Sequence, residues 1–75
     1  MTDPDKQLLY FERNHPRPSG YKDHAIREEL DLEPTVYFAR LNALLDDPEA
    51  YVFDPQLVKR LRRLRDRHRA VRRSA

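Results

Sequence analysis

The chain contains a single glycine, Gly20, but six prolines, and this imbalance limits the folds that its 75 residues can adopt. Sheets built from short strands need many turn residues, and one glycine is too few for them. Proline cannot continue a helix beyond its first turn, so the prolines mark where helices begin and end. The sequence therefore predicts an all-α protein that is divided at its prolines.

Four helices are expected from these marks and from the spacing of the apolar residues. Asp3-Pro4 and Asp54-Pro55 each combine a capping residue with proline at the first helical position, and Pro34 also starts a helix. The segment Pro16-Arg17-Pro18 separates the first helix from the second, and Asp46-Asp47-Pro48 ends the third. The expected helices cover residues 5–13, 21–30, 34–45 and 55–73.

The second and third helices form a predicted helix-turn-helix, with the turn near residues 31–34. Leu30 and Leu32 flank the turn, and Tyr37 and Leu41 pack the third helix across the second. The expected fold is a small tri-helical helix-turn-helix domain with an N-terminal helix and a long basic C-terminal helix. An ordinary αα-hairpin in a small bundle has the same pattern. Six aromatic residues are expected in the core: Tyr10, Phe11, Tyr37, Phe38, Tyr51 and Phe53.

Charge is distributed unevenly along the chain, although the net charge is only +2. Residues 1–53 hold six Lys/Arg and eleven Asp/Glu, which gives −5, whereas residues 54–75 hold nine Lys/Arg and two Asp, which gives +7. We therefore expect a helical body, residues 1–53, and a basic C-terminal helix, residues 54–75, that is partly packed on the body. A basic arm of this kind is typical of proteins that bind a polyanion.

Apolar residues of the C-terminal helix recur at intervals of four and three, which places five side chains on one seam: Leu57, Leu61, Leu64, His68 and Val71. Arg62 is expected opposite this seam. Crowded cations repel one another, and a phosphate backbone would relieve the repulsion. The predicted phosphate contacts are Lys59, Arg60, Arg62, Arg63, Arg65, Arg67, Arg69, Arg72 and Arg73. A homodimer through Leu64, His68 and Val71 is compatible with the same pattern.

The outward face of the third helix is poor in side chains that read bases. Thr35 and Asn42 can hydrogen-bond base edges, and Arg40 lies toward the flank, so these three complete the predicted nucleic-acid contacts. Asp46 and Asp47 lie at the end of this helix, where the helix dipole disfavours anions. An alternative function is a protein-interaction module that contacts the transcription machinery or another protein. Its predicted surface is Val36, Ala39, Ala43 and Asp46.

No catalytic, metal or cofactor site is expected. The chain has no cysteine, and its three histidines share no metal-ligand spacing. A domain this small has little room for a substrate pocket. No apolar run approaches the roughly 20 residues of a membrane span, and the acidic residues 1–5 do not form a secretory signal. We therefore expect a cytoplasmic, nucleoid-located protein that is not an enzyme.

Several short segments between about Leu8 and Arg65 form a recognisable set: Phe11-Glu12-Arg13, Ala25-Ile26-Arg27-Glu28, Leu41-Asn42-Ala43-Leu44-Leu45-Asp46, Pro48, Asp54-Pro55 and Leu57-Val58-Lys59-Arg60-Leu61-Arg62-Arg63-Leu64-Arg65. Through these segments the sequence resembles a family of small, uncharacterised actinobacterial proteins, which is known only as a domain of unknown function. The helix-turn-helix of that family is similar to region four of sigma factors. The resemblance implies DNA binding, through the fold alone.

The chain departs from this family at three places. It has Asn14-His15-Pro16 where an aromatic pair is usual, and Asp31 where glycine is usual in the turn. Val36 and Ala39 stand where a cation and an amide are often found. Sequence-specific reading by the third helix is therefore expected to be weak. The expected function is a DNA-binding protein, a small transcriptional regulator or nucleoid-associated factor, with affinity from the arginine-rich helix, although such segments bind RNA as well as DNA.

Overall fold

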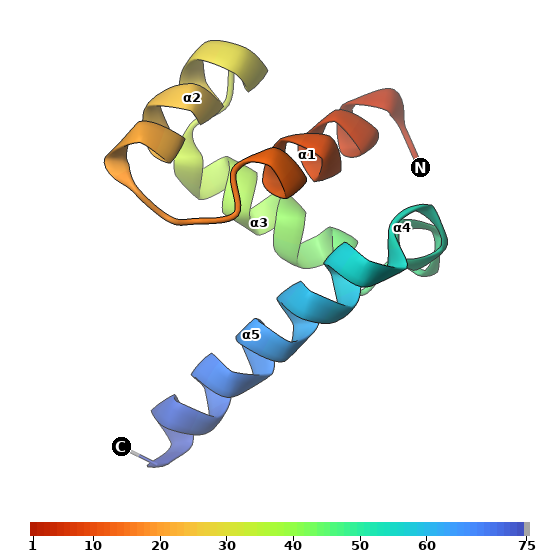
Figure 1. Ribbon diagram of the computed structural model, residues 1–75, viewed down its shortest axis with the longest axis vertical. Coiled ribbons are helices and arrows are strands. Elements are labelled where there is room, and N and C mark those ends of the chain that lie inside the picture. Colours follow the sequence, from red (N-terminus) through yellow and green to blue (C-terminus); the bar gives the residue numbers. More distant parts are fainter. Residues whose placement is uncertain (75) are drawn as a thin grey trace.

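Five α-helices account for the fold in a computed structural model, which describes the backbone of residues 1–74 and the side chains of residues 1–68. The helices are α1 (Asp3–Asn14), α2 (Gly20–Leu30), α3 (Pro34–Leu44), α4 (Pro48–Phe53) and α5 (Pro55–Ser74). No residue within 1–74 lies in a strand, so the predicted all-α fold is confirmed. Figure 1 shows α1, α2 and α3 grouped together, while α5 begins beside α4 and extends away from it.

The short helix α4 was not expected from the sequence. Its N-cap is Asp47, whose carboxylate accepts a hydrogen bond from the Glu49 backbone N–H at 2.9 Å, and Pro48 begins the helix. This is the same signal of a capping residue followed by proline that correctly predicts the start of α5. Asp47 therefore acts as the N-cap of α4. This role explains why a carboxylate stands directly after the end of α3.

The first helix begins earlier than the sequence indicates. Thr2, rather than Asp3, is the N-cap of α1, and it forms a capping box with Asp5. The Thr2 hydroxyl accepts from the Asp5 backbone N–H, and the Asp5 carboxylate accepts from the Thr2 backbone N–H, each at 3.3 Å. This reciprocal pair satisfies two N–H groups that a helix start leaves without partners.

The turn between α2 and α3 contains the one described non-glycine residue with a positive φ angle. Asp31, which caps the C-terminus of α2, has φ 54° and ψ 40°. This is the left-handed region, where glycine is normally preferred because a Cβ atom is crowded there. Leu30 and Leu32 on either side are half-buried against the core.

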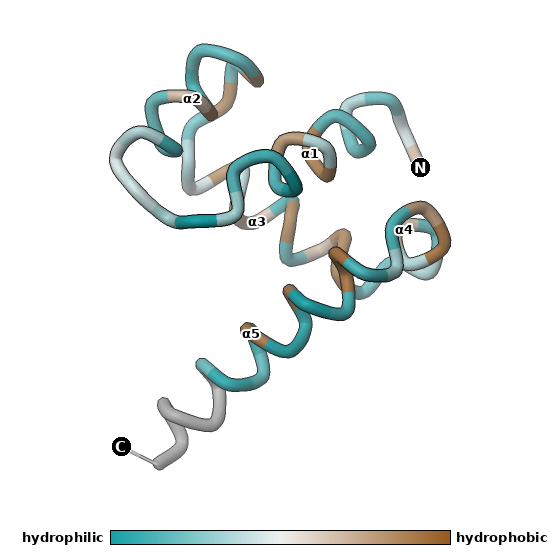
Figure 2. Tube along the Cα trace, in the orientation of Figure 1, coloured by the Kyte–Doolittle hydropathy of each residue, from teal (hydrophilic) through white to brown (hydrophobic). Residues whose placement is uncertain are grey.

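The core lies where α1, α2 and α3 meet α4 and the first turns of α5. Its buried apolar residues are Leu8, Leu9, Phe11, Ala25, Ile26, Tyr37, Leu41, Leu44, Leu45, Ala50, Leu57 and Val58. In Figure 2 the hydrophobic segments of α5 lie on the side turned toward the other helices, and hydrophilic segments follow the other side. The core therefore includes only the beginning of α5.

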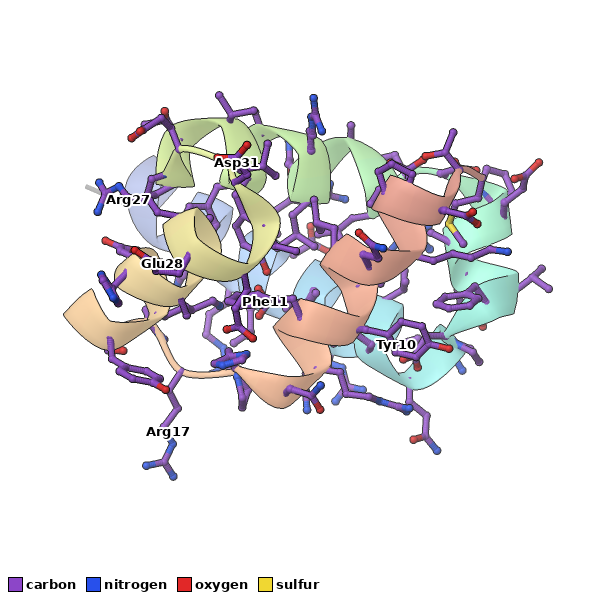
Figure 3. All side chains as sticks on the ribbon, turned by 90° about the horizontal axis from the view of Figure 1, so that it is seen from above. Tyr10, Phe11, Arg17, Arg27, Glu28 and Asp31 are labelled. Atoms are coloured by element: carbon purple, nitrogen blue, oxygen red, sulfur yellow. The ribbon has the colours of Figure 1, made fainter. Side chains whose placement is uncertain are left out.

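Two of the six aromatic residues expected in the core are largely exposed. Tyr10 retains 56% of its accessible surface and Phe38 retains 42%, whereas Phe11 and Tyr37 are buried. Figure 3 shows that Tyr10 and Phe11, although adjacent in sequence, lie on different sides of α1. The Tyr10 ring packs edge-on against Phe53, with the ring centroids 5.5 Å apart. The expectation was wrong for Tyr10 and Phe38 because each stands one residue from the buried face of its helix.

A buried ion pair joins α1 to α2. Lys22 Nζ donates to both carboxylate oxygens of Glu12, at 2.8 and 2.9 Å, and their side chains are only 4% and 3% exposed. The ammonium group also lies 5.6 Å from the centroid of the Phe38 ring, which is on α3. The three helices of the helix-turn-helix body therefore share a polar centre as well as an apolar core.

Candidate nucleic-acid interface

The basic helix α5 is anchored at its first turn. Asp54, only 9% exposed, accepts a hydrogen bond from the Leu57 backbone N–H at 3.3 Å, as a helix cap does. The same carboxylate lies 3.3 Å from Arg13 Nε of α1. Leu57 and Val58 then enter the core with 2% and 0% exposure. The start of α5 is thus held by the body through both polar and apolar contacts.

Three cations of α5, Lys59, Arg62 and Arg65, contact residues of the helical body. Lys59 Nζ and Arg62 Cζ lie 5.7 and 5.6 Å from the centroid of the Tyr51 ring, so that the ring has two cations at its face. Arg62 Nε also donates to the backbone carbonyl of Leu45, at the C-terminal end of α3. The expectation that Arg62 points away from the seam was wrong. Because Val58 occupies the core, the packed face of α5 is rotated toward Arg62.

Arg65 makes the most extensive of these contacts. Its Nη1 and Nη2 donate to the two carboxylate oxygens of Asp46 at 3.1 and 2.9 Å, and Nη1 also donates to Asn42 Oδ1 at 3.2 Å. The hydrogen bond to Asp46 raises the pKa of the Arg65 guanidinium further above its usual value. Asn42 and Asp46 are therefore already bonded within the molecule. We call this arrangement of Asn42, Asp46 and Arg65 the α3–α5 clasp.

Three other cations of α5 are exposed and share one face of the helix. At about 100° per residue, Arg60, Arg63 and Arg67 fall within about 60° of arc around the helix axis. Among the residues whose side chains are described, no acidic group forms an ion pair with any of them. We call these three residues the arginine stripe. Four further predicted residues, Arg69, Val71, Arg72 and Arg73, lie outside the described side chains.

The residues of α3 that are predicted to contact nucleic acid or a protein partner do not form one continuous surface. Thr35, Val36, Ala39, Asn42 and Ala43 are all exposed. Arg40 lies on the opposite edge of α3 from the clasp, in a shallow surface depression with Asp5, which is on α1. Arg40 and Asn42 therefore cannot be treated as parts of one base-reading surface.

The seam predicted for a homodimer begins at the edge of the core. Leu61 is half-buried, Leu64 is 41% exposed, and His68 is exposed. An open groove of about 420 Å³ separates this part of α5 from α3, and Phe38 and Leu41 line its α3 side. The apolar packing of α5 on the body thus ends near Leu61, although the seam predicted from the sequence continues to Val71.

Neither a metal site nor a membrane span is found in the part of the chain that the structure describes. No group of three or more His, Cys, Asp or Glu side chains there could hold a metal ion. None of the described helices combines the length and the apolar character needed to cross a membrane.

Comparison with known families matches residues 1–73 to a family described as "Protein of unknown function (DUF3263)". The chain belongs to this family. No curated protein and no solved structure matches it. The DUF3263 assignment confirms the resemblance to an uncharacterised domain family, and it covers α1 to α4 and nearly all of α5. Because the family has no described function, the function of this member has to be argued from its own residues.

The clasp and the Tyr51 contacts were not predicted from the sequence. One signal for the clasp was present, since Asp46 stands at the end of α3, where the helix dipole opposes a negative charge. A cation from another helix is expected to neutralise such a charge. The sequence does not show which cation does so, because Arg65 reaches Asp46 only through the direction in which α5 runs. For Tyr51 the sequence offers no signal of this kind, because many pairs of aromatic and cationic residues are available.

Proposed function

We propose that this DUF3263 protein binds DNA, and that the arginine stripe on α5 supplies the contacts with the phosphate backbone. One observation supports this most. Arg60, Arg63 and Arg67 are exposed on a single face, whereas Lys59, Arg62 and Arg65 are engaged with the body. Three like charges that form no ion pair with a described side chain lie along roughly 10 Å of helix, and they repel one another. A polyanion removes this repulsion and releases its own counterions.

The expected binding is weakly sequence-specific. Base reading in the major groove depends on side chains such as Arg, Lys, Asn and Gln. On the outer face of α3 the side-chain oxygen of Asn42 already accepts from Arg65, and Val36, Ala39 and Ala43 offer only apolar contacts. A nucleoid-associated protein or a small regulator in the cytoplasm, with the helix-turn-helix serving to orient α5, fits these properties.

A salt titration of duplex DNA binding tests the proposal. Replacing Arg60, Arg63 and Arg67 together with Gln should weaken binding uniformly across sequences. If each of the three neutralises one phosphate, the slope of log K against log salt should become less negative by about 2.7. Fluorescence anisotropy at several salt concentrations measures both quantities. Wild-type protein that fails to bind DNA at low salt would overturn the proposal.

A matched control variant carries the same change in net charge elsewhere. Lys6, Arg17 and Arg27 lie on the body, and replacing all three with Gln also removes three positive charges. Figure 3 shows Arg17 and Arg27 extending outward from the loop before α2 and from α2 itself. This variant should keep the salt slope of the wild type. An equal loss in both variants would indicate that net charge, and not the arginine stripe, determines binding.

A second candidate function is supported by the exposed apolar side of α3. Val36 retains 41% of its accessible surface, and Ala39 and Ala43 are exposed on the same face of the helix. Such a surface suits a protein partner, for example within the transcription machinery. Partners that survive nuclease treatment and are lost on Val36→Lys or Ala39→Lys would favour this function. The same substitutions add positive charge, so they should not weaken DNA binding through the arginine stripe.

A further inference from the structure

The C-terminal end of α3 receives two cations from α5. Arg62 bonds to the carbonyl of Leu45, and Arg65 bonds to the carboxylate of Asp46, the next residue along the chain. The end of a helix carries partial negative charge on its unpaired carbonyls, and Asp46 adds a full charge. Two guanidinium groups therefore neutralise one helix end, and both come from the helix that carries the arginine stripe.

The clasp differs from an ordinary exposed ion pair. The Arg65 side chain is only 19% exposed, although that of Asp46 is 66% exposed. Arg65 Nε is buried and has no hydrogen-bond partner within the described residues. A planar guanidinium bound through two parallel hydrogen bonds is fixed in orientation as well as in position. Arg65 thus holds α5 in a defined direction instead of only attracting it.

The position of the clasp along α5 gives it a specific consequence. Apolar packing ends near Leu61, and beyond it Leu64 and His68 are exposed. Among the described side chains, none after Arg65 forms a hydrogen bond or ion pair with the body. The clasp is therefore the last described bond that sets the angle between α5 and α3, and the stripe residue Arg67 lies beyond it.

We infer that Arg65 and Asp46 are positioning residues for DNA binding: the α3–α5 clasp fixes the direction of α5 so that the arginine stripe faces the phosphate backbone. This inference rests on the proposed function. It assigns Arg65 a role that differs from the direct phosphate contact expected from the sequence, since its Nη atoms are bonded to Asp46 and Asn42.

The two roles predict opposite effects of Asp46→Ala. If Arg65 contacts phosphate directly, removal of Asp46 frees a cation and removes a negative charge, so DNA affinity rises. If Arg65 positions α5, affinity falls although the protein becomes more positive. We expect a three- to tenfold loss. Glu28→Ala is the control with the same charge change, because Glu28 is exposed on the outer side of α2, and it should not weaken binding.

Exchange of the two charges provides a rescue. The double variant Asp46→Arg/Arg65→Asp keeps the net charge and restores an ion pair between the same positions. Affinity within about twofold of the wild type is expected for the double variant, together with weaker binding for each single variant. Circular dichroism establishes that every variant retains the helical content of the wild type. Higher affinity of Asp46→Ala, or failure of the double variant to recover, would overturn the positioning role.

A measurement without DNA separates this inference from the proposed function. Because the chain has no cysteine, spin labels can be attached at Ala39→Cys on α3 and Leu64→Cys on α5. The distance distribution between the labels should be narrow in the parent and broad with Asp46→Ala. An unchanged distribution would overturn the clasp as the element that directs α5. Absence of DNA binding by the wild type would instead overturn the proposed function.

Discussion

The Tyr37 hydroxyl donates to Glu12 Oε1 at 2.7 Å, and the same oxygen accepts from Lys22 Nζ at 2.8 Å. Tyr37 is fully buried, and its ring also packs edge-on against Phe11. One carboxylate on α1 is therefore shared by an ammonium group from α2 and a phenol from α3. Buried charges of this kind are tolerated only when each receives partners, so the three side chains depend on one another.

Stability should decrease at alkaline pH because of Tyr37. Burial, assisted by the hydrogen bond to Glu12, raises the pKa of Tyr37 well above its usual value of about 10. Above about pH 10 the unfolded chain loses the phenolic proton while the folded protein keeps it, so the free energy of unfolding falls as pH rises. The contribution of this residue should decline by about 1.4 kcal/mol per pH unit above pH 10.

Tyr37→Phe isolates this contribution. At neutral pH the variant should lose about 1.5–3 kcal/mol, which is typical for a hydrogen bond to a charged group. The difference in free energy of unfolding between wild type and variant should be constant below pH 9 and should shrink above pH 10. Urea denaturation at a series of pH values measures it. A difference that stays constant up to pH 11.5 would contradict the assigned cause.

Removing the cation of the buried ion pair should be more damaging than removing both charges. Lys22→Met leaves Glu12 buried without its counter-charge, which typically costs about 3–5 kcal/mol. Glu12→Gln/Lys22→Met has no charge left at this site, and the side-chain oxygen of the introduced glutamine can still accept from Tyr37. The double variant should therefore be more stable than Lys22→Met alone, as measured by a double-mutant cycle in urea. If the two losses simply add, the residues are not coupled.

The turn residue Asp31 offers a stabilising substitution. It adopts a left-handed conformation and places a negative charge at the C-terminal end of α2, and both features are unfavourable. Asp31→Gly should raise the free energy of unfolding by about 0.5–1 kcal/mol, and Asp31→Ala should lower it. Thermal unfolding followed by circular dichroism compares the two. Equal melting temperatures for both variants would show that the backbone conformation at this turn has no energetic consequence.

The cap of α4 should be needed for the local order of this helix. Asp47→Ala removes the acceptor of the Glu49 backbone N–H, and such a change typically costs about 1 kcal/mol. Asp47→Ser retains an acceptor and should lose less. Amide hydrogen exchange in residues 49–53 reports the effect directly. Uniform exchange rates in all three proteins would mean that the cap contributes nothing to α4.

Helix boundaries were predictable where capping chemistry and proline act locally. Pro34 and Asp54-Pro55 start helices in the structure because the preference of proline for the first turn does not depend on distant contacts. At Asp47-Pro48 the sequence predicts the end of the preceding helix but not the start of α4, which the structure contains. A proline that stops one helix can also start the next, and the spacing of apolar residues cannot separate these roles over so short a helix.

The candidate interface was less predictable than the fold. The sequence predicts the same role, phosphate contact, for all described cations of α5, yet Arg62 and Arg65 bond to the end of α3 while Arg60 and Arg63 do not. This division depends on which side of α5 faces the core. The 4-3 spacing of leucines indicated the side of Leu64, whereas burial of Val58 turns the helix toward Arg62. Omission of Val58 from the predicted buried face thus changes which arginines are expected to contact the body and which are expected to be exposed.

The division of α5 into an engaged and a free set of arginines follows from the step of about 100° between neighbours. One residue inserted after Val58 would turn the rest of the helix by that step. Arg60 would then stand where Leu61 packs, and Arg62 would take the exposed place of Arg63. Substitutions along the free face leave this register intact, whereas an insertion of any length that is not close to a whole number of turns destroys it. Natural length variation is therefore expected in the loops and at the chain ends, but not between Val58 and Arg67.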